Sequence, residues 1–396
     1  MVNESYRGAG YCGWRAAGQL PRRGGEAYRE PVFDEADRPA VTKRDWRISL
    51  WLALAVALAA PPLARAGTAP PMKPVIAGFI DMQNIAWHNS DDGSPSFTLD
   101  NVNRFPGLFG GIVLNATWAE MQPLQRSLPQ TARIDAALNQ VRQYNLAHPT
   151  ARLGVKLRIF AGNQAPPWAK AIAGGPLTIQ RNPQGCPSGD CPITIGKVWD
   201  SRYIAAWRAF QRMVAARYDS VPLIRSVAVT SCTMETDEPF VMPVQQPIPQ
   251  GYTDAAGMAC LRGAVNDYAA WQRTPIDFTI NAFQDIQMGG SDPAFSIAIM
   301  TECRRKLGPR CELGNHAFSS DMPLGNANIV AAIAAKGAPI HYQTVGPNSP
   351  DFKWTPTVVA ARHDHATALE LWPEFGGFTT LTTTAMQKLK IRFSGK

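Results

Sequence analysis

Eight short apolar runs, separated by segments with helical spacing, most strongly constrain the fold of this chain. Continuous apolar strands that alternate with helices predict a parallel sheet covered on its outside. Eight such units predict that the sheet closes, so we expect an α/β protein with a single-domain (β/α)8 (TIM) barrel; an open doubly wound sheet is the alternative. The runs cover residues 74–82, 110–118, 154–162, 226–235, 276–283, 310–318, 339–345 and 368–375.

The intervening segments have the spacing of amphipathic helices. Residues 201–218 are the clearest example, because apolar side chains recur every three or four positions on one face and arginines fall largely elsewhere. Residues 134–147, 292–308 and 326–337 have similar patterns. The length of the chain after position 66, 330 residues, suits one barrel with insertions.

The first 66 positions differ in composition from the rest. Residues 41–66 combine a basic flank, an apolar stretch from about Ile48, and Ala64 and Ala66 at an A-x-A site. This pattern predicts a signal peptide cleaved after Ala66. The stretch is shorter than the roughly 20 residues of a membrane span, so we expect no membrane anchor after cleavage and a periplasmic or extracellular location.

Residues 1–40 are rich in Gly, Arg and acids and have little apolar periodicity. Such a segment is typical of disorder or of an overlong gene model with a true start near Val41. We therefore expect the folded domain to comprise residues 67–396.

Charge and motifs exclude several functions. Leaving out the 10 basic and 7 acidic residues of the first 66 positions reduces 39 and 31 to 29 and 24, with no basic cluster among aromatics. We therefore expect no nucleic-acid partner. The chain has no phosphate-binding Gly-rich loop, no G-x-S-x-G and no H-E-x-x-H. We expect no cofactor and a monomer.

Six cysteines follow the predicted signal peptide, and an even number in an exported protein favours disulfides. Six cysteines allow fifteen pairings, but two short loops favour local pairs. No second close pair or His pair has zinc spacing, so we expect no metal site. The predicted pairs are Cys186 with Cys191, Cys303 with Cys311, and by remainder Cys232 with Cys260.

Amides, acids and tryptophans follow the predicted strands. Active sites of (β/α)8 barrels are built from the loops after the strands. A sugar offers an apolar face to an indole and hydroxyls to amides and carboxylates, so this mixture predicts an oligo- or polysaccharide partner. The candidate substrate-binding residues are Trp118, Glu120, Trp168, Asn315, His316, His341, Gln343 and Trp372.

Three segments resemble the barrel glycoside hydrolases of clan A, which include β-galactosidase-like and cellulase-like families. "WAEMQP" (118–123) is similar to their W-x-x-I-E-P segment, and "GVKLRIFAGNQAPPWAK" (154–170) resembles their third strand and its Pro-Trp loop. Residues 199–235 resemble the helix and fourth strand that deliver the acid/base Glu. The likeness covers most of residues 74–380 and implies a glycosidase.

Glycoside cleavage needs one carboxylic acid that protonates the leaving oxygen and a second carboxylate. Glu235 is the candidate acid, because a strand through residues 229–235 would point it to the same face as Ser231 and Thr233. The alternative is that Glu235 only solvates a strand end.

The resemblance has two departures: Met234 stands where the clan has Asn, and Gln343 stands where it has the nucleophilic Glu. The second carboxylate is then Glu370 or Glu374. Glu370 is preferred because it shares a strand face with Trp372, which matches the clan's indole platform. Glu370 as a buried acceptor for barrel residues is the alternative.

The sequence therefore predicts a secreted glycosidase. Two other functions stay open: a barrel that binds carbohydrate without catalysis, and a polysaccharide lyase or transglycosylase on the same scaffold.

Overall fold

The computed structural model describes residues 70–83, 97–180, 191–235, 248–285, 290–322, 324–345, 352–373 and 377–395. The chain divides into two compact units, Met1–Ala69 and Pro70–Lys396, and every described residue belongs to the second. The predicted signal peptide, Cys186 and Glu374 lie outside the described residues.

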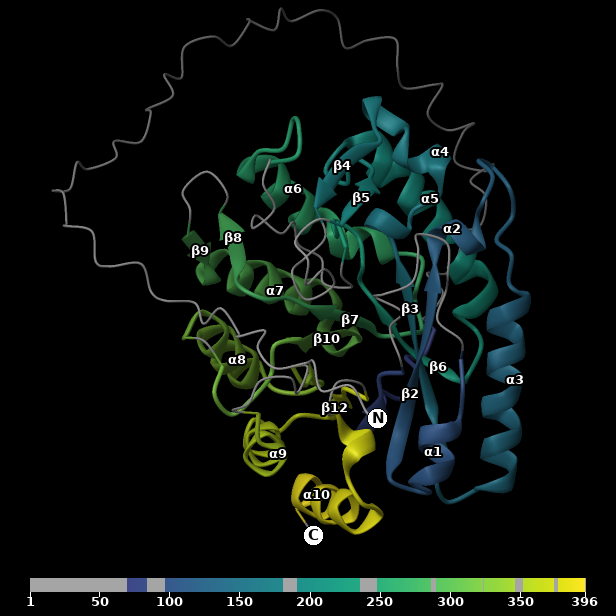
Figure 1. Ribbon diagram of the computed structural model, residues 1–396, viewed down its shortest axis with the longest axis vertical. Coiled ribbons are helices and arrows are strands. Elements are labelled where there is room, and N and C mark those ends of the chain that lie inside the picture. Colours follow the sequence, from purple (N-terminus) through teal and green to yellow (C-terminus); the bar gives the residue numbers. More distant parts are fainter. Residues whose placement is uncertain are drawn as a thin grey trace, which may run out of the picture. The chain divides into compact units, whose positions relative to one another are not determined.

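Eight parallel strands form one sheet in the order β10-β7-β6-β3-β2-β1-β12-β11. A parallel bridge between Leu313 and Ile340 joins its two ends, so the sheet is a (β/α)8 barrel, as predicted (Figure 1). Each apolar run overlaps one barrel strand. The strands are β1 (Gly78–Asp81), β2 (Phe109–Thr117), β3 (Gly154–Phe160), β6 (Ile224–Ala228), β7 (Ile276–Thr279), β10 (Cys311–Gly314), β11 (His341–Gln343) and β12 (Ala368–Leu371).

Helices surround the strands, and two short antiparallel hairpins, β4–β5 and β8–β9, lie among the loops (Figure 1). All four predicted helical segments are helices. The hairpin strands are β4 (Leu177–Gln180), β5 (Pro192–Ile195), β8 (Phe283–Asp285) and β9 (Gly290–Asp292). The helices are α1 (Asp100–Arg104), α2 (Trp118–Met121), α3 (Ala132–Ala147), α4 (Pro167–Lys170), α5 (Ser201–Tyr218), α6 (Asp254–Ala264), α7 (Pro293–Leu307), α8 (Leu324–Lys336), α9 (Trp354–His363) and α10 (Thr383–Ser394).

Local sequence sets where the longer helices begin. Asp200 precedes α5 and accepts a hydrogen bond from the Arg202 backbone N–H, while Asp292 does the same for Phe295 before α7. Such caps satisfy backbone donors that have no partner inside the helix. None of the helices in the described part of the chain is long and apolar enough to cross a membrane.

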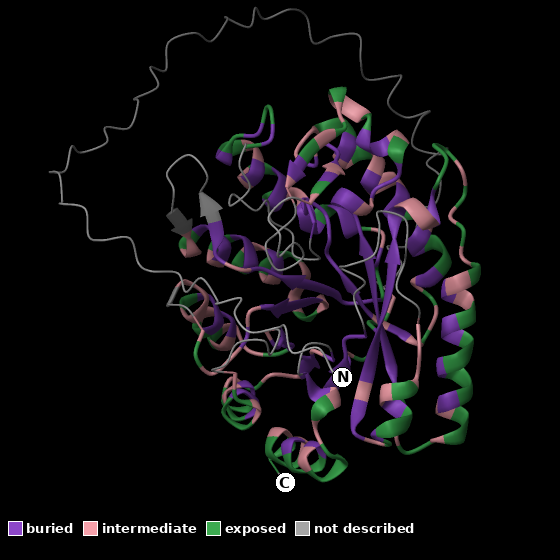
Figure 2. Ribbon diagram, viewed as in Figure 1, coloured by how far each residue is buried: buried purple, intermediate pink, exposed green. Residues whose placement is uncertain are grey.

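The main core lies between the strands and the inner faces of the helices (Figure 2). Trp118 is at its centre on the α5 side, fully buried, with ring centroids 5.0 Å from Trp207 and 5.3 Å from Trp168. Burying aromatic rings of this size contributes strongly to stability. This layer fixes α5 against the barrel.

The interior of the barrel is divided by chemistry. Apolar side chains form one cluster of Ile76, Ile80, Val113 and Ala368, and Met82, Phe160 and Trp372 form another at the strand ends. Branched apolar side chains usually fill such a barrel. Here titratable side chains from five strands occupy the rest of the interior: Lys156, Arg158, Asp277, Glu312, His341 and Glu370.

Two disulfides are confirmed, Cys232–Cys260 and Cys303–Cys311, with Cα–Cα distances of 5.9 and 6.0 Å. Cys191 is disulfide-bonded as well. The first disulfide joins the loop after β6 to α6, and the second joins α7 to β10.

Lys73 lies in the segment before β1 and binds residues at the N-terminal end of the barrel. Its ammonium donates to the carbonyl oxygens of Tyr218, Val221 and Ile224 at 3.3, 2.8 and 2.8 Å, and to Thr274 Oγ1 at 2.8 Å. Hydrogen bonds to a charged group are stronger than neutral ones. One side chain therefore connects β1, α5, β6 and β7.

We expect Lys73→Met to lower the free energy of unfolding by about 2 to 4 kcal/mol, because the carbonyls lose charge-assisted hydrogen bonds. Urea unfolding followed by circular dichroism measures the change. Lys388→Met, at an exposed position on α10, is the matched control and should change stability by less than about 0.5 kcal/mol. Equal effects of the two variants would contradict this role of Lys73.

Candidate functional site

The loop after β6 carries Glu235. The prediction of a strand through residues 226–235 is wrong in its extent: β6 ends at Ala228, and the backbone then turns, with φ of 65° at Cys232. The alternation of side chains therefore does not place Glu235. A disulfide-bonded residue with positive φ gives no signal in hydrophobic periodicity, so the sequence could not show this turn.

Glu235 is nevertheless buried, with 7% of its surface exposed. The loop that carries it contacts the loop after β3, where the Asn163 N–H donates to the Met234 carbonyl oxygen at 2.8 Å. Gly162 permits this approach, since a Cβ there would lie 2.3 Å from the same oxygen. The Glu235 backbone is thus placed at the C-terminal end of the barrel, between the ends of the third and fourth barrel strands.

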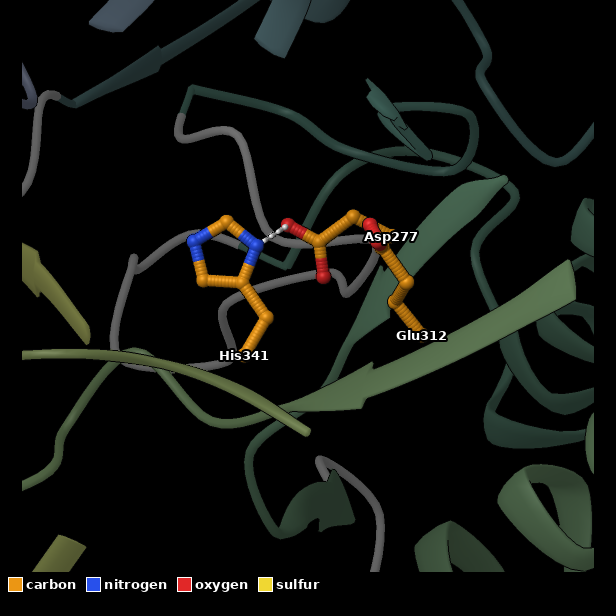
Figure 3. A group of neighbouring side chains, drawn as sticks. All are labelled: Asp277, Glu312 and His341. Carbon is orange, nitrogen blue, oxygen red and sulfur yellow. Dashed lines mark ion pairs between the residues drawn. The ribbon is translucent and has the colours of Figure 1, made fainter. Parts of the chain in front are cut away.

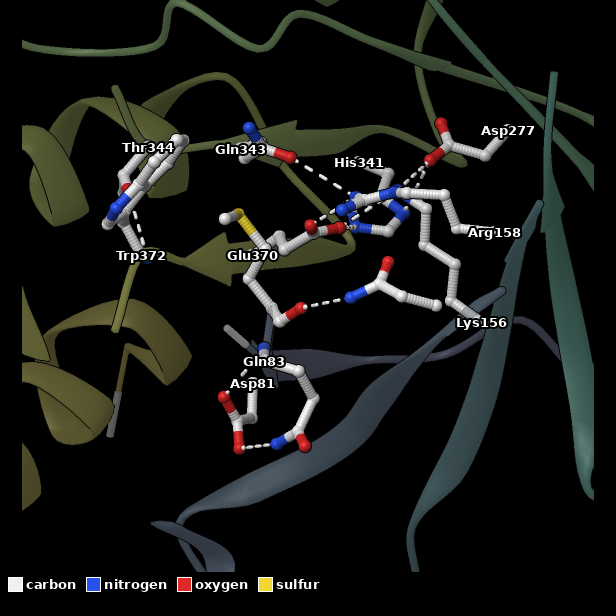
Figure 4. Close-up of polar contacts among 12 residues, drawn as sticks. Asp81, Gln83, Lys156, Arg158, Asp277, His341, Gln343, Thr344, Glu370 and Trp372 are labelled. Atoms are coloured by element: carbon white, nitrogen blue, oxygen red, sulfur yellow. Dashed lines mark hydrogen bonds and ion pairs between the residues drawn. The ribbon is translucent and has the colours of Figure 1, made fainter. Parts of the chain in front are cut away.

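Glu370 lies in the barrel interior, fully buried between two cations (Figure 4). Lys156 Nζ donates to its Oε2 at 2.8 Å, and Arg158 Nη2 donates to its Oε1. Burial alone would raise the pKa of Glu370, but the charges of Arg158 and Lys156 hold it well below its usual value. Both oxygens of Glu370 are thus engaged. Trp372 lies just beyond β12, which ends at Leu371, so a shared face with Glu370 stays a prediction.

Lys156 also forms an ion pair with Asp277 on β7. The Asp277 Oδ2 is 3.4 Å from His341 Nδ1 (Figure 3). The Glu370 Oε2 is 3.4 Å from His341 Nε2. Burial and the neighbouring Lys156 lower the pKa of His341, so the imidazole is neutral near pH 7.

Glu312 on β10 is the third acid of the interior. Burial, with a contribution from the Asp277 charge, raises its pKa to about 8, and its carboxyl forms a hydrogen bond with Ser226 Oγ. Glu312 is therefore protonated near pH 7. Two positive charges, Lys156 and Arg158, then face two negative charges, Asp277 and Glu370, and the interior charges balance.

Asp277, Glu312 and His341 bring three potential ligand atoms within 4.8 Å of one another. The donor set does not fit a metal ion, because the Lys156 ammonium is ion-paired with Asp277 at this place. A divalent cation would have to enter beside that charge in a dry interior, where repulsion is strong. Lys156 serves as the internal cation of the cluster.

Gln343 occupies the end of the seventh barrel strand (Figure 4). Its Oε1 accepts a hydrogen bond from Arg158 Nη2 at 3.2 Å, which fixes the orientation of the amide. The side chain is 3% exposed, and within the described residues its Nε2 donates no hydrogen bond. The amide therefore offers a donor, while Arg158 occupies its acceptor.

Trp372 follows β12 and packs against Met82 and Phe160 from the ends of the first and third barrel strands. Its backbone N–H donates to Thr344 Oγ1 at 3.1 Å. The indole remains half-buried. These three side chains, of which only Trp372 is partly exposed, form an apolar group at the strand ends that we call the Trp372 cluster.

Asp81, at the end of β1, organises the loop that follows it. Its Oδ1 accepts a hydrogen bond from the Gln83 N–H at 3.0 Å (Figure 4). The same oxygen accepts from Asn101 Nδ2 at 3.4 Å. Burial raises the pKa of Asp81 to about 6. Gln83 adopts φ of 63° and donates from Nε2 to the same carboxylate, so Asp81 has a local structural task.

The tryptophans predicted at the second and third strands lie in the core layer on the α5 side. Trp118 is fully buried, and its Nε1 donates to Gln122 Oε1 at 3.0 Å, so the ring offers no surface to a ligand. Trp168 is half-buried, and its Nε1 donates to the Gln122 carbonyl oxygen. Glu120 forms an ion pair with Arg133 of α3.

Asn315 and His316 follow β10 and are both buried. Asn315 Nδ2 donates to Asn281 Oδ1 at 2.8 Å and to the Ile280 carbonyl oxygen at 3.2 Å, which connects the ends of β7 and β10. His316 lies close to Asp277, and a positive charge on His316 lowers the pKa of the Asp277 carboxyl. Three of the predicted residues, Gln343, Glu370 and His341, lie in one network. Arg158 bonds both Gln343 and Glu370, and Glu370 in turn contacts His341.

The sequence interpretation missed Lys156, Arg158, Asp277 and Glu312. Their signal was present, because each is a charged residue inside an otherwise apolar run, and Lys156 and Arg158 are two positions apart on one strand face. Charges that are buried in strands must be paired. That rule predicts partners but not which strand provides them.

The fold and site define a (β/α)8 barrel with a charged interior and a buried carboxyl group in a loop after its fourth strand. No model of a known protein family matches the chain, and no curated protein sequence matches it.

Among solved structures, the chain is similar to endo-glycoceramidase II from Rhodococcus sp., with 13% identity over 81% of both chains and a TM-score of 0.49. It is also similar to the catalytic domain of beta-amylase from Paenibacillus polymyxa, with 11% identity over 75% of this chain and 92% of that one and a TM-score of 0.45. A morphinone reductase in complex with tetrahydroNAD matches with 13% identity over 74% and 82% and a TM-score of 0.44. At this level the likeness does not assign a function.

We expect Glu312 to contribute a fall in stability as the pH rises from 5 to 8.5, so that the stability of Glu312→Gln falls less, or rises more, than that of wild type. The raised pKa of Glu312 means that the folded state holds a proton that the unfolded state releases above about pH 4.5. The contribution of Glu312 to the free energy of unfolding is therefore fully present below about pH 4.5. It is lost as the pH rises through about 8.

Urea unfolding at several pH values measures both slopes. The control is Glu302→Gln, a surface residue of α7 whose pKa is lowered by Lys306, so its charge is constant over this range. Parallel slopes for wild type and Glu312→Gln would contradict the protonation of Glu312.

Proposed function

We propose that the protein is an exported glycoside hydrolase that acts on an oligo- or polysaccharide, with Glu235 as the general acid. One observation carries the proposal: a carboxyl group is held, 7% exposed, in the loop after the fourth strand, at the end of the barrel where this fold builds its active sites. The segment that carries it is also the one that resembles the acid/base segment of clan A. The predicted signal peptide and the disulfides support export.

In this proposal Glu235 donates its proton to the glycosidic oxygen as the bond to the anomeric carbon breaks. A second carboxylate then either attacks the anomeric carbon or activates a water molecule. Their separation decides the stereochemical outcome, with about 5 Å for retention and roughly 6.5 to 9.5 Å for inversion.

Glu370 and Glu374 are the candidates for the second carboxylate. A nucleophile must give up its ion pairs as it forms a bond, and Glu370 would leave Lys156 and Arg158 buried with one partner fewer. These contacts favour Glu374 for the chemistry. They give Glu370 a different task, which is to hold Arg158 and, through it, the amide of Gln343.

The half-buried indole of the Trp372 cluster suits the apolar face of a sugar ring, and the Nε2 donor of Gln343 suits a hydroxyl oxygen. An apolar surface with a few oriented polar groups is the usual composition of a small-molecule site. Both features lie at the C-terminal ends of strands, as Glu235 does. This combination supports carbohydrate as the ligand.

A carbohydrate-binding barrel without catalysis is the second candidate. The observation that favours it is Gln343, because an amide cannot act as the nucleophile that the resemblance would place there. A polysaccharide lyase or transglycosylase would use the same loops.

Glu235→Gln should lower kcat on a cleaved glycan by about 10²- to 10⁴-fold with little change in KM, because an amide cannot donate the proton. Release of reducing ends measures the rate, and Glu302→Gln is the surface control. A loss of less than about tenfold would exclude Glu235 as the general acid.

Activity and unfolding measurements together distinguish Glu374 from Glu370. Glu374→Gln should remove activity, because an amide can neither attack the anomeric carbon nor activate water. Glu370→Gln should instead lower the free energy of unfolding by about 3 to 5 kcal/mol, since it breaks two buried ion pairs. A stable, inactive Glu370→Gln variant would reverse the assignment.

A further inference from the structure

The loop of residues 229–235 has an unusual backbone that needs support. At its start the Val229 N–H donates to the Asp277 carbonyl oxygen of β7 at 3.0 Å. Cys232 then adopts φ of 65°, which is strained for a residue other than Gly. Such a conformation persists only when the surrounding structure determines it.

Tyr268 provides the first support, from the short helix Val265–Tyr268 (η3) that follows α6. Its hydroxyl oxygen accepts the Thr230 backbone N–H at 2.8 Å and lies 3.2 Å from Thr230 Oγ1. Thr230 Oγ1 donates its single proton to the Ile159 carbonyl oxygen. The Tyr268 O–H must therefore donate to Thr230 Oγ1, and every polar atom in this contact has a partner.

The next two residues of the loop are joined to the same helical block. Ser231 Oγ donates to the Ala264 carbonyl oxygen at 3.5 Å, and Cys232 is covalently bonded to Cys260 of α6. Three consecutive residues thus contact residues 260–268. Two positions later, the Met234 carbonyl oxygen accepts from Asn163, and Glu235 follows directly.

The helical block of residues 260–268 is also bound to helix α5. Arg208 of α5 forms an ion pair with Asp267 at 2.7 Å, and the Asp267 carboxylate is almost fully buried. Tyr268 is fully buried as well, and burial raises the pKa of its hydroxyl, which stays a proton donor. The block is therefore joined to α5 and buried at the residue that contacts the loop.

We infer that Tyr268 and the Cys232–Cys260 disulfide are positioning groups for Glu235. Together with Ser231, they bind residues 230–232 to the helical block of residues 260–268. The backbone that leads to Glu235 is therefore restricted to one conformation. The inference rests on the proposed function and extends it to residues that do not touch a substrate. Catalysis is sensitive to such support, since a displacement of 1 Å can reduce a rate by about 10²-fold.

Tyr268→Phe tests the hydrogen-bonded support. Hydrogen exchange of the Thr230 amide should become about tenfold faster, because its acceptor is lost. The kcat should fall by about 10- to 10²-fold while KM stays within about twofold. The pH profile of kcat should also shift, because Glu235 changes its surroundings.

Tyr218→Phe is the matched control. Tyr218 is equally buried, and its hydroxyl donates to Asp135 Oδ1 at 3.0 Å, at the opposite end of α5 from the site. It should lose similar stability, but exchange in residues 229–235 and kcat should match wild type.

The double variant Cys232→Ser/Cys260→Ser tests the covalent support, with Cys303→Ser/Cys311→Ser as its control. The first pair should speed exchange in residues 229–235 and lower kcat, and the second should do neither. Faster exchange with unchanged kcat would overturn the inference, as would equal effects in test and control variants.

Failure of the proposed function gives a different result. Full activity in Glu235→Gln would remove Glu235 from the chemistry and with it the catalytic part of the inference. The exchange measurements need no substrate, so they would still decide whether Tyr268 and the disulfide hold the loop.

Discussion

The ion pairs of Lys156 are the interaction on which the barrel interior depends. Lys156 is fully buried and joins Asp277 of β7 to Glu370 of β12 across the barrel. Moving charges out of water costs several kcal/mol per ion, so each must find partners with good geometry. Arg158 satisfies the second oxygen of Glu370, and Glu312 remains protonated, so the cluster is neutral.

This requirement divides the acids of the chain into two groups. Asp277 and Glu370 keep their charges because cations face them, and they are committed to the fold. Glu235 lies outside the cluster, in a loop, where support comes from backbone contacts, a tyrosine hydroxyl and a disulfide. Acids of the same type therefore have different tasks because of their environments.

The sequence predicted the barrel because eight apolar runs and the helical spacing between them are local patterns, and local patterns determine these elements. It predicted two disulfides from loop length and remainder. It could not show that β6 ends at Ala228, since the turn depends on the strained Cys232. Nor could it show that Trp118 faces α5 or that Lys156 meets Glu370, 214 positions away. Those contacts depend on the closed barrel, which no local pattern encodes.

The central claim is that the loops at the C-terminal end of this barrel cleave glycosidic bonds. The most direct test incubates the purified wild-type protein with a panel of oligo- and polysaccharides and measures both binding and the release of reducing ends. The account predicts that at least one glycan is bound and that reducing ends accumulate in proportion to enzyme and time. Tight binding of a glycan without any release of reducing ends would contradict it.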